Sequence, residues 1–228
     1  AIRMDFTNIR GHEKTIEILK KSIRNKAVSH SFLFEGEEGI GKKLVAYVFS
    51  KALLCEEGKG EPCNRCSSCM KFDRGNHPDF FVIEPEKNLI RKAEIEGLVG
   101  QMTTAPFESK RKVFIINDSH KMNIESTNAL LKTLEEPPEF VNIILISSIP
   151  NNLLRTILSR VHNVKFYPLN TLEVENILRE KYQLSEMEAR FIANFTRGAM
   201  GRSVELAEDE GFFKRREELI NILDYLIR

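Results

Sequence analysis

Tryptophan is absent from the 228-residue sequence, and tyrosine occurs only four times. The 34 Lys and Arg residues are almost balanced by 33 Asp and Glu residues, so the net charge is only +1. Proteins that bind nucleic acid by themselves usually present a basic surface, often with aromatic side chains on which bases stack. The composition therefore argues against a stand-alone nucleic-acid-binding protein, and we expect the isolated chain to have little affinity for DNA.

Long apolar runs are also lacking. The longest ones, such as residues 143–146, are far shorter than the roughly 20 residues that a membrane-spanning helix needs. The first segment, "AIRMDFTNIRGHEK", carries charges where a signal peptide would need an apolar stretch. These absences predict a cytoplasmic protein with no membrane partner. The length fits one large domain, or a large domain and a small one.

Five short segments rich in β-branched and aromatic residues lie in the first 168 residues, at 30–35, 79–84, 112–117, 142–147 and 164–167. They are continuously apolar rather than alternating, which is typical of parallel strands buried on both faces. Helical patterns separate them; Ile95, Leu98 and Met102, for example, recur at helical spacing. Alternating strands and helices predict a doubly wound α/β domain over residues 1–168.

After Pro168 the strand signal disappears. Two segments, 170–182 and 185–196, have the N-cap candidates Thr171 and Ser185 at their starts and continue with helical apolar spacing. They predict a small helical domain over residues 169–209. A third helical pattern starts at residue 212 and has no stop signal. We interpret residues 210–228 as the start of a further helical domain that is truncated, and we expect the chain to be monomeric by itself.

The segment "FLFEGEEGIGKKL" at residues 32–44 almost matches a nucleotide-binding P-loop, G-x-x-x-x-G-K-[ST]. Gly36, Gly41 and Lys42 occupy the required positions, and Gly39 adds a further glycine between them. The next residue of a working P-loop carries the hydroxyl that binds Mg²⁺, but here it is Lys43. An ammonium group at that position repels a metal ion, so Mg²⁺ is not expected to bind.

All four cysteines lie within fifteen residues, at Cys55, Cys63, Cys66 and Cys69. The segment "CNRCSSC" contains two overlapping C-x₂-C steps, the spacing of ligand pairs in structural zinc sites. Free thiols and disulfides are the alternatives, and a cytoplasmic location argues against disulfides. The spacing predicts a structural Zn²⁺ site in a module of residues 55–69, with four cysteine ligands and no open position. Binding should weaken at low pH, because the ligands must be deprotonated.

Together these motifs resemble the clamp-loader subunits of the bacterial replicative DNA polymerase, within the AAA+ ATPases. The resemblance covers essentially the whole chain, and includes "SHSFLFEGEEGIGKK", the cysteine cluster, "NALLKTLEEPPE" at 128–139 and "LLRTILSR" at 153–160. Within the family, "GNHPDFFVIEPE" at 75–86 is similar to the delta-prime type rather than to the gamma/tau type. The resemblance implies a RecA-like five-stranded parallel sheet flanked by helices, a helical lid at 169–209 and a helical collar that starts at 210–228.

In a working AAA+ ATPase, an Asp that binds Mg²⁺ and a Glu that polarises water follow the third apolar strand. Here the strand is followed by Asn117 and Asp118, or by Asp118 and Ser119 if the register shifts by one. Either alignment lacks one carboxylate, and an amide is a poor ligand for a hard cation. The resemblance places the residue that senses the γ-phosphate at Ser147 or Ser148.

The lid motif departs from the family pattern as well. Motor subunits read G-S-x-R there, whereas this chain reads "GAMGR", with Gly201 at the arginine position and Arg202 about 100° further round the helix. With Lys43 and Asn117, this departure predicts that the chain does not hydrolyse ATP. Weak binding of a nucleotide or of phosphate without Mg²⁺ stays open, through Gly36, Gly39, Gly41 and Lys42. The alternative is a glycine turn that only packs the strand against its helix.

The segment "LSRV" at 158–161 corresponds in this family to a Ser-Arg-Cys motif, with Val161 in the cysteine position. The resemblance implies that Arg160, preceded by Ser159, is an arginine finger that enters the ATP site of a neighbouring subunit. A guanidinium there would stabilise the charge that develops during phosphoryl transfer. The alternative is an arginine that forms a salt bridge at the edge of the domain.

The resemblance thus implies a largely non-hydrolysing, delta-prime-like subunit. Its partners would be gamma/tau and delta subunits and, through the complex, the sliding clamp and primer–template DNA. It also implies a backbone contact to DNA at the helix that starts within "MNIESTNALL", with Ser126 and Thr127 donating to phosphates. The main alternative is an active gamma/tau-type ATPase, against which Lys43, Asn117 and Gly201 argue.

Overall fold

The computed structural model describes residues 4–227, with side chains up to residue 218 and at residue 220. Residues 1–3 and 228, at the ends of the predicted segments 1–168 and 210–228, lie outside this description. The contacts divide the chain into two compact units. The first unit runs up to Glu37 and continues over Lys42–Tyr167, and the second comprises Glu38–Gly41 and the chain from Pro168 onward.

The first unit is built on a five-stranded sheet in the order β2-β3-β4-β1-β5. Its strands are β1 (Ser31–Glu35), β2 (Phe80–Ile83), β3 (Lys112–Ile116), β4 (Val141–Ser147) and β5 (His162–Lys165). Every pairing is parallel, and Leu33 of β1, for example, lies between Leu145 of β4 and Asn163 of β5. The parallel α/β fold predicted from the sequence is therefore confirmed.

The central strands β3, β4 and β1 are buried, as their apolar composition predicts. The edge strand β5 differs, because most of its residues are exposed. The prediction of a buried strand at 164–167 is wrong: β5 begins at His162, which pairs with Phe32. An edge strand needs only one hydrogen-bonding neighbour, so polar residues suffice there. The apolar Phe166 instead follows the strand and packs its ring against Phe34, 5.1 Å between centroids.

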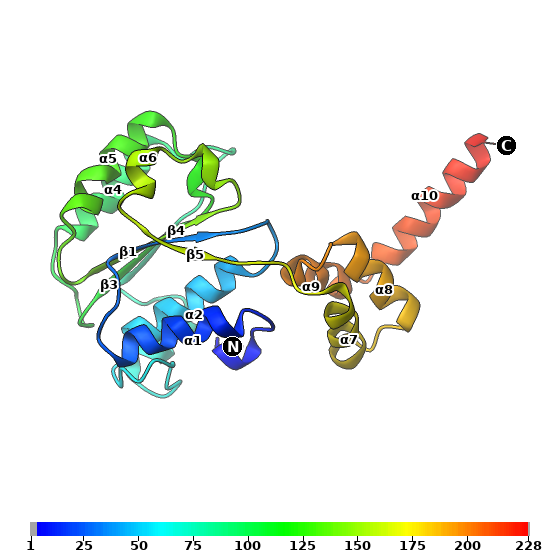
Figure 1. Ribbon diagram of the computed structural model, residues 1–228, viewed down its shortest axis with the longest axis horizontal. Helices are drawn as coiled ribbons and strands as arrows, with labels where there is room; N and C mark the ends of the chain where they lie inside the picture. The colour runs from blue at the N-terminus through cyan, green and yellow to red at the C-terminus, as the bar shows by residue number, and fades with distance from the viewer. Residues whose placement is uncertain (1–3, 228) are drawn as a thin grey trace. The chain divides into compact units, whose positions relative to one another are not determined.

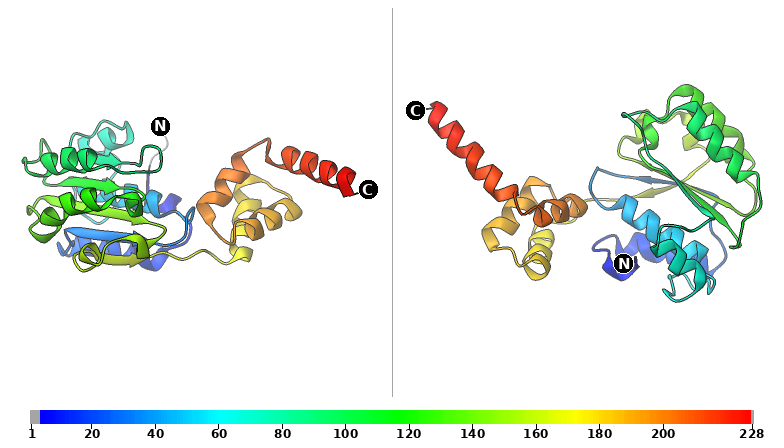
Figure 2. Two further views of the ribbon diagram at one scale, coloured as in Figure 1. Left: turned by 90° about the horizontal axis from the view of Figure 1, so that it is seen from above. Right: turned by 180° about the vertical axis from the view of Figure 1, so that it is seen from behind.

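Helices cover both faces of this sheet (Figures 1 and 2). On one face lie α1 (Glu13–Arg24) and α2 (Lys42–Leu54), and on the other lie α4 (Lys92–Met102), α5 (Ile124–Glu135) and α6 (Arg155–Leu158). The first unit also contains α3 (Ser67–Asp73) and the 3₁₀ turns η1 (Phe6–Asn8), η2 (Ser119–Lys121) and η3 (Pro150–Asn152). Apolar residues of α4 and α5, such as Ile95, Met102 and Leu130, are fully buried against the sheet.

The second unit is helical, with α7 (Thr171–Tyr182), α8 (Glu186–Phe195), α9 (Met200–Glu208) and α10 (Phe212–Ile227). Its core is formed by buried residues of α7, α8 and α9, among them Val174, Ile192 and Met200. Ser185 caps α8, as predicted, and the structure adds a reciprocal hydrogen bond with Glu188. The predicted cap Thr171 is wrong by one residue, because the Asn170 side chain accepts the Leu172 N–H. No described helix is long and apolar enough to cross a bilayer.

Candidate functional site

The glycine-rich loop connects β1 to α2 at the carboxyl edge of the sheet. Gly39 and Gly41 have φ angles of +77° and +101°, a conformation that glycine adopts without strain. Lys42 is only 6% exposed, and its Nζ donates to the carbonyls of Gly36 at 2.7 Å and Glu37 at 2.6 Å. The lysine that reaches the phosphates in a P-loop is therefore bound to carbonyl groups of its own loop.

Lys43 stands where the Mg²⁺-binding hydroxyl would be, and it forms an ion pair with Glu84, which follows β2. Its Nζ also lies 5.9 Å from the centroid of the Tyr47 ring. Burial favours the neutral amine, but the hydrogen bond and the charge of Glu84 outweigh it and raise the pKa of Lys43. A divalent cation would thus meet a fixed positive charge whose counter-ion is already in place.

The residues predicted to complete the nucleotide site meet at the same edge of the sheet. The Gly36 N–H donates to the Ser147 carbonyl at 3.3 Å, and the Asn117 N–H to the Ile83 carbonyl at 2.9 Å. Asp118 has a left-handed φ of +47°, and its carboxylate lies 3.0 Å from Lys121 Nζ. The one carboxylate of this motif is therefore neutralised by a lysine.

The two serines at the end of β4, Ser147 and Ser148, differ in burial. Ser147 is fully buried, with Oγ 3.2 Å from His120 Nδ1, and it accepts the Ile149 N–H at 3.1 Å. Ser148 follows in a half-buried bend. Of the two, Ser147 is held in one orientation by neighbouring groups, and its hydroxyl is occupied by the chain itself.

Within the second unit, the loop tip Glu38–Gly41 packs against α9. The Arg202 N–H donates to the Gly39 carbonyl at 3.0 Å. A Cβ atom on Gly201 would lie 2.7 Å from that carbonyl oxygen, and a Cβ on Gly39 would lie 2.9 Å from the Arg202 Cβ. Only glycine fits at position 201 without a shift of the loop, which gives a physical reason for the missing lid arginine. The Arg202 guanidinium itself lies 5.9 Å from the centroid of the Phe195 ring.

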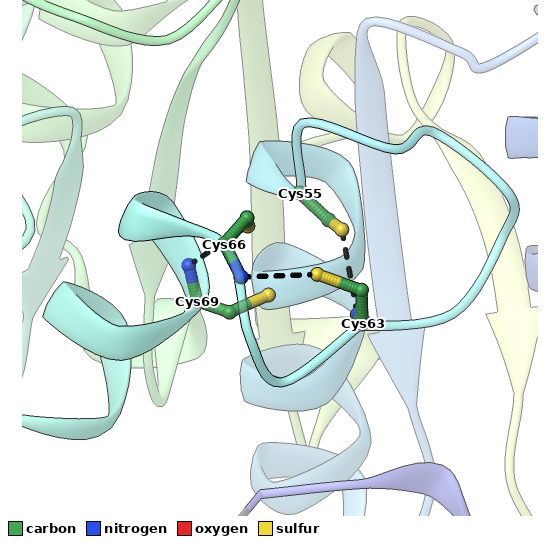
Figure 3. Close-up of side chains that lie close together, drawn as sticks. All are labelled: Cys55, Cys63, Cys66 and Cys69. Atoms are coloured by element: carbon green, nitrogen blue, oxygen red, sulfur yellow. Dashed lines mark hydrogen bonds between the residues drawn. The ribbon is translucent and has the colours of Figure 1, made fainter.

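The four cysteines converge between α2 and α3 (Figure 3). Their sulfur atoms all lie within 4.8 Å of one another. The N–H groups of Cys63, Cys66 and Cys69 approach the sulfurs of the preceding cysteines at 3.3–3.4 Å. A tetrahedral zinc ion with Zn–S bonds of about 2.3 Å requires sulfurs about 3.8 Å apart. The donor set and its spacing therefore make this cluster a candidate metal site that fits zinc.

The thiols of the cluster differ in pKa: burial disfavours the Cys63 thiolate, but hydrogen bonds to its sulfur outweigh burial and lower the pKa of Cys63 to about 7. Burial raises the pKa of the Cys55 thiol and of the Cys69 thiol. Two buried sulfurs with raised pKa values stay protonated in the absence of a nearby cation. A bound metal ion supplies the positive charge that all four thiolates require.

A buried lysine joins the cysteine loop to the P-loop helix. Lys51 of α2 is fully buried, and its Nζ lies 2.7 and 2.8 Å from the two carboxylate oxygens of Asp73. The same Nζ donates to Asn64 Oδ1 at 2.6 Å and to the Met4 carbonyl at 3.0 Å. Asn64 follows Cys63 directly, and Asp73 ends α3. This network orients the cysteine loop from outside the sulfur cluster, as outer partners do in metal sites.

His77 connects α3 to the loop that precedes β3 through hydrogen bonds. Its Nε2 lies 2.8 Å from Ser68 Oγ and 3.3 Å from Ser109 Oγ. Ser68 Oγ already donates to the Leu54 carbonyl at 2.7 Å, so it accepts from Nε2, which carries the proton. Nδ1 accepts the Asp79 N–H at 3.1 Å. The imidazole is therefore neutral, and its tautomer is set by its partners.

We expect His77 to remain neutral at pH values where a free histidine, with a pKa of about 6.5, is half protonated. Burial lowers the pKa of His77, and the charges of Asp79 and Glu108 counter this only in part. The unfolded chain takes up this proton first, so acidification below about pH 6.5 should reduce the free energy of unfolding. Imidazole ¹⁵N NMR shifts between pH 5 and 8 test this, with free histidine as the reference. A His77 midpoint at or above 6.5 would contradict it.

Arg160 follows α6, and its guanidinium contacts two elements. Nη1 donates to the Thr156 carbonyl at 2.7 Å and to Ser159 Oγ at 3.1 Å, and Nη2 donates to Glu135 Oε1 at 2.6 Å. The Arg160 side chain is 32% exposed and that of Glu135 48%. Arg160 thus forms a salt bridge at the end of α5, as the alternative interpretation predicts. Its guanidinium nevertheless remains open to solvent, and Ser159 helps to orient it.

The predicted DNA contact at the start of α5 does not agree with the structure. Ser126 and Thr127 are 0% and 3% exposed. Asn123 caps the helix by accepting the Ser126 N–H at 2.8 Å, and Ser126 Oγ donates back to the Asn123 carbonyl at 2.9 Å. The prediction that these two hydroxyls donate to phosphates is wrong, because they turn into the protein and Asn123 serves the helix end.

The sequence did not identify three charged residues at these sites: Glu84, Lys51 and Glu135. Glu84 directly follows an apolar strand at the edge where the glycine loop begins, and that placement was an available signal. Lys51 sits in the middle of a helical pattern, and its buried partners become apparent only in the fold. Glu135 is 25 residues from Arg160, and no local pattern connects the two.

Comparison with known proteins gives a consistent picture. A family profile described as "DNA polymerase III, delta subunit" matches residues 11–170. The DNA polymerase III subunit delta' of Bacillus subtilis is 35% identical over 213 residues, which cover 93% of this chain and 64% of that protein. The subunit tau of the same organism is 32% identical over 209 residues, covering 89% of this chain and 37% of tau. The chain therefore spans less than two thirds of the length of either relative.

Among solved structures, a DNA polymerase III gamma subunit-related protein from Thermotoga maritima matches with a TM-score of 0.52 and 21% identity. The match covers 91% of this chain and 78% of that one. At this identity the similarity supports the fold alone. The profile match over residues 11–170 shows more, because it covers most of the chain and includes the glycine loop, the cysteine cluster and Arg160. The chain belongs to the DNA polymerase III delta subunit family, and its sequence is of the delta-prime type.

Proposed function

We propose that the protein is a largely non-hydrolysing, delta-prime-like subunit of the DNA polymerase III clamp loader, which helps to load the sliding clamp onto primed DNA. Its partners are gamma/tau and delta subunits, and it reaches the clamp and primer–template DNA through the complex. Arg160 acts in trans at the ATP site of a neighbouring subunit. The family match and the delta' relative support the assignment to the complex.

We further propose that the second unit is a lid domain over residues 169–209 and that α10 begins a collar domain. The four cysteines hold a structural Zn²⁺ ion as thiolates, with no coordination position left for a substrate. The convergence of all four sulfurs and the Lys51 network behind them support this assignment. Neither feature requires ATP, so both are compatible with a subunit that does not turn over nucleotide.

The main support for the proposal that this subunit does not hydrolyse ATP is the Lys43–Glu84 ion pair at the position of the Mg²⁺ ligand. Mg²⁺ prefers oxygen ligands in an octahedral arrangement, and its usual partners are a hydroxyl, carboxylates and phosphates. At this position the chain offers an ammonium group with its own counter-ion. Asp118, the nearest carboxylate of the motif, is paired with Lys121. Productive phosphoryl transfer with bound Mg²⁺ therefore lacks its metal site.

Calorimetric titration with a non-hydrolysable ATP analogue tests this part of the proposal. We expect no Mg²⁺-dependent heat from the metal-replete chain, because Lys43 and Glu84 occupy the cation position. The variant Lys42→Ala serves as the matched control, and its titration should not differ from that of the wild type in the presence of Mg²⁺. Tight binding that requires Mg²⁺ and is lost in Lys42→Ala would instead support the gamma/tau-type ATPase, which the 32% identity to tau keeps as the second candidate.

A further inference from the structure

We propose that Glu135 is a positioning residue for Arg160: its carboxylate fixes the guanidinium so that one donor edge stays open to an anionic ligand. The inference rests on the proposed role of Arg160 in trans, and it adds a residue that no sequence pattern singles out. The ligand would be a phosphate group carried by the neighbouring subunit.

The hydrogen bonds of Arg160 leave one edge of the guanidinium available. A guanidinium has five N–H donors in a planar fork. Three are engaged, two on Nη1 with Thr156 and Ser159 and one on Nη2 with Glu135. The other two, on Nε and Nη2, have no partner among the described residues. Nε and Nη2 form the side edge of the fork, on which an oxyanion can accept two parallel hydrogen bonds.

The anchors of Nη1 alone do not fix this edge. Thr156 and Ser159 both belong to α6 or its C-cap, and α6 is a helix of only four residues. Both acceptors hold the same terminal nitrogen and come from this one short helix, so the far edge of the guanidinium follows any movement of α6. Glu135 holds the other terminal nitrogen from a different element. Restricting a long side chain before the reaction removes an entropic cost from the reacting complex.

The element that carries Glu135 is suited to this role. It is the last residue of α5, a helix of twelve residues whose Leu130 and Leu134 are buried in the core. The salt bridge therefore positions Arg160 relative to α5, which packs on the sheet, and not only relative to the short helix α6. An exposed ion pair of this kind adds little to stability. Orientation is therefore the main consequence of the Glu135 contact.

The carboxylate does not need to leave when an anion arrives. Glu135 contacts Arg160 through Oε1 and Nη2 only, so Nε is not engaged by it. If Glu135 instead competed with the phosphate for the guanidinium, its removal would accelerate the reaction. The two roles thus predict opposite changes in rate.

The test uses the full-length chain assembled with its ATPase partners, with single-turnover hydrolysis of ATP as the readout. We expect Glu135→Ala to slow the phase that depends on Arg160 by about tenfold, less than the roughly 100-fold that a 1 Å misplacement can cost. The KM for ATP should stay unchanged, because Glu135 does not touch the nucleotide. Glu135→Gln, which keeps an oxygen acceptor for Nη2, should recover most of the rate.

Two controls separate this inference from the proposed function. Glu136→Ala removes the same charge from the next, exposed residue and should leave the rate unchanged. In an Arg160→Ala background, Glu135→Ala should have no further effect. A slow Arg160→Ala variant beside a wild-type or faster Glu135→Ala variant would overturn the positioning role alone. An unchanged rate in Arg160→Ala would overturn the proposed function, and the positioning role with it.

Discussion

Replacing Arg160 by alanine should slow the hydrolysis of one ATP for each copy of this chain in the assembled complex by about 10³-fold or more. The reason is electrostatic: negative charge moves onto the phosphoryl oxygens in the transition state, and a guanidinium placed there lowers the barrier. Arg160 is partly exposed, hydrogen-bonded to Thr156, Ser159 and Glu135, and keeps two donors for an external acceptor. The other ATP sites of the complex should retain their rates.

Rapid-quench measurement of a single turnover would resolve the slowed ATP site as a separate slow phase. Arg160→Lys keeps the charge but loses the planar fork, so it should restore only part of the rate. Arg155→Ala provides the matched control, since Arg155 is an exposed arginine on the same short helix. Gel filtration must show that each variant assembles. An intact Arg160→Ala complex with wild-type kinetics in every phase would rule out the finger assignment.

Removal of the zinc ion that we propose at the cysteine cluster should reduce the free energy of unfolding of the first unit by several kcal/mol. For comparison, Zn²⁺ binding supplies about 10–16 kcal/mol in zinc-finger peptides, where it determines the whole fold. The loss should be smaller here because Lys51 and His77 hold Asp73 and Ser68 independently of the sulfurs. We therefore expect amide exchange to increase most in the cysteine loop, residues 55–66, and less in α3.

Urea unfolding and hydrogen exchange, with and without a chelator, would measure this effect. Elemental analysis should find one zinc ion per chain, and chelation should become easier at low pH because the thiolates are protonated. Cys69→Ser removes the fully buried ligand, and chelator should then cause no further loss of stability. Ser67→Ala, a change beside the ligands that removes no sulfur, provides the control. A metal-free chain with unchanged unfolding and exchange would exclude a structural role for the cluster.

The sequence predicted those parts of the molecule in which one pattern determines one structure. Buried strands such as β3 and β4 need apolar side chains on both faces, and Val113, Phe114 and Ile144 provide that signal. The cysteine cluster was found because the steps between Cys63, Cys66 and Cys69 set the ligand geometry. The edge strand β5 was misplaced because its polar residues need only one neighbour.

The remaining features depend on contacts between distant residues. Lys43 was recognised as a substitution, but its partner Glu84 lies 41 residues away and was not. Ser126 and Thr127 were assigned to the surface, since helix propensity alone does not show which way a hydroxyl points. The absence of an arginine at position 201 was clear from the sequence, whereas its cause, the carbonyl of Gly39, required coordinates.

The Gly39–Gly201 contact also restricts how such a chain could change over evolutionary time. A single substitution at position 201 cannot restore a lid arginine, because any Cβ atom there would meet the Gly39 carbonyl oxygen at 2.7 Å. A change at Gly39 is disfavoured in turn, by its φ of +77° and by the Arg202 Cβ. Each glycine thus makes a side chain at the other position costly. An arginine at position 201 would require the loop and the helix to change together, so we expect the two glycines to be kept or replaced as a pair.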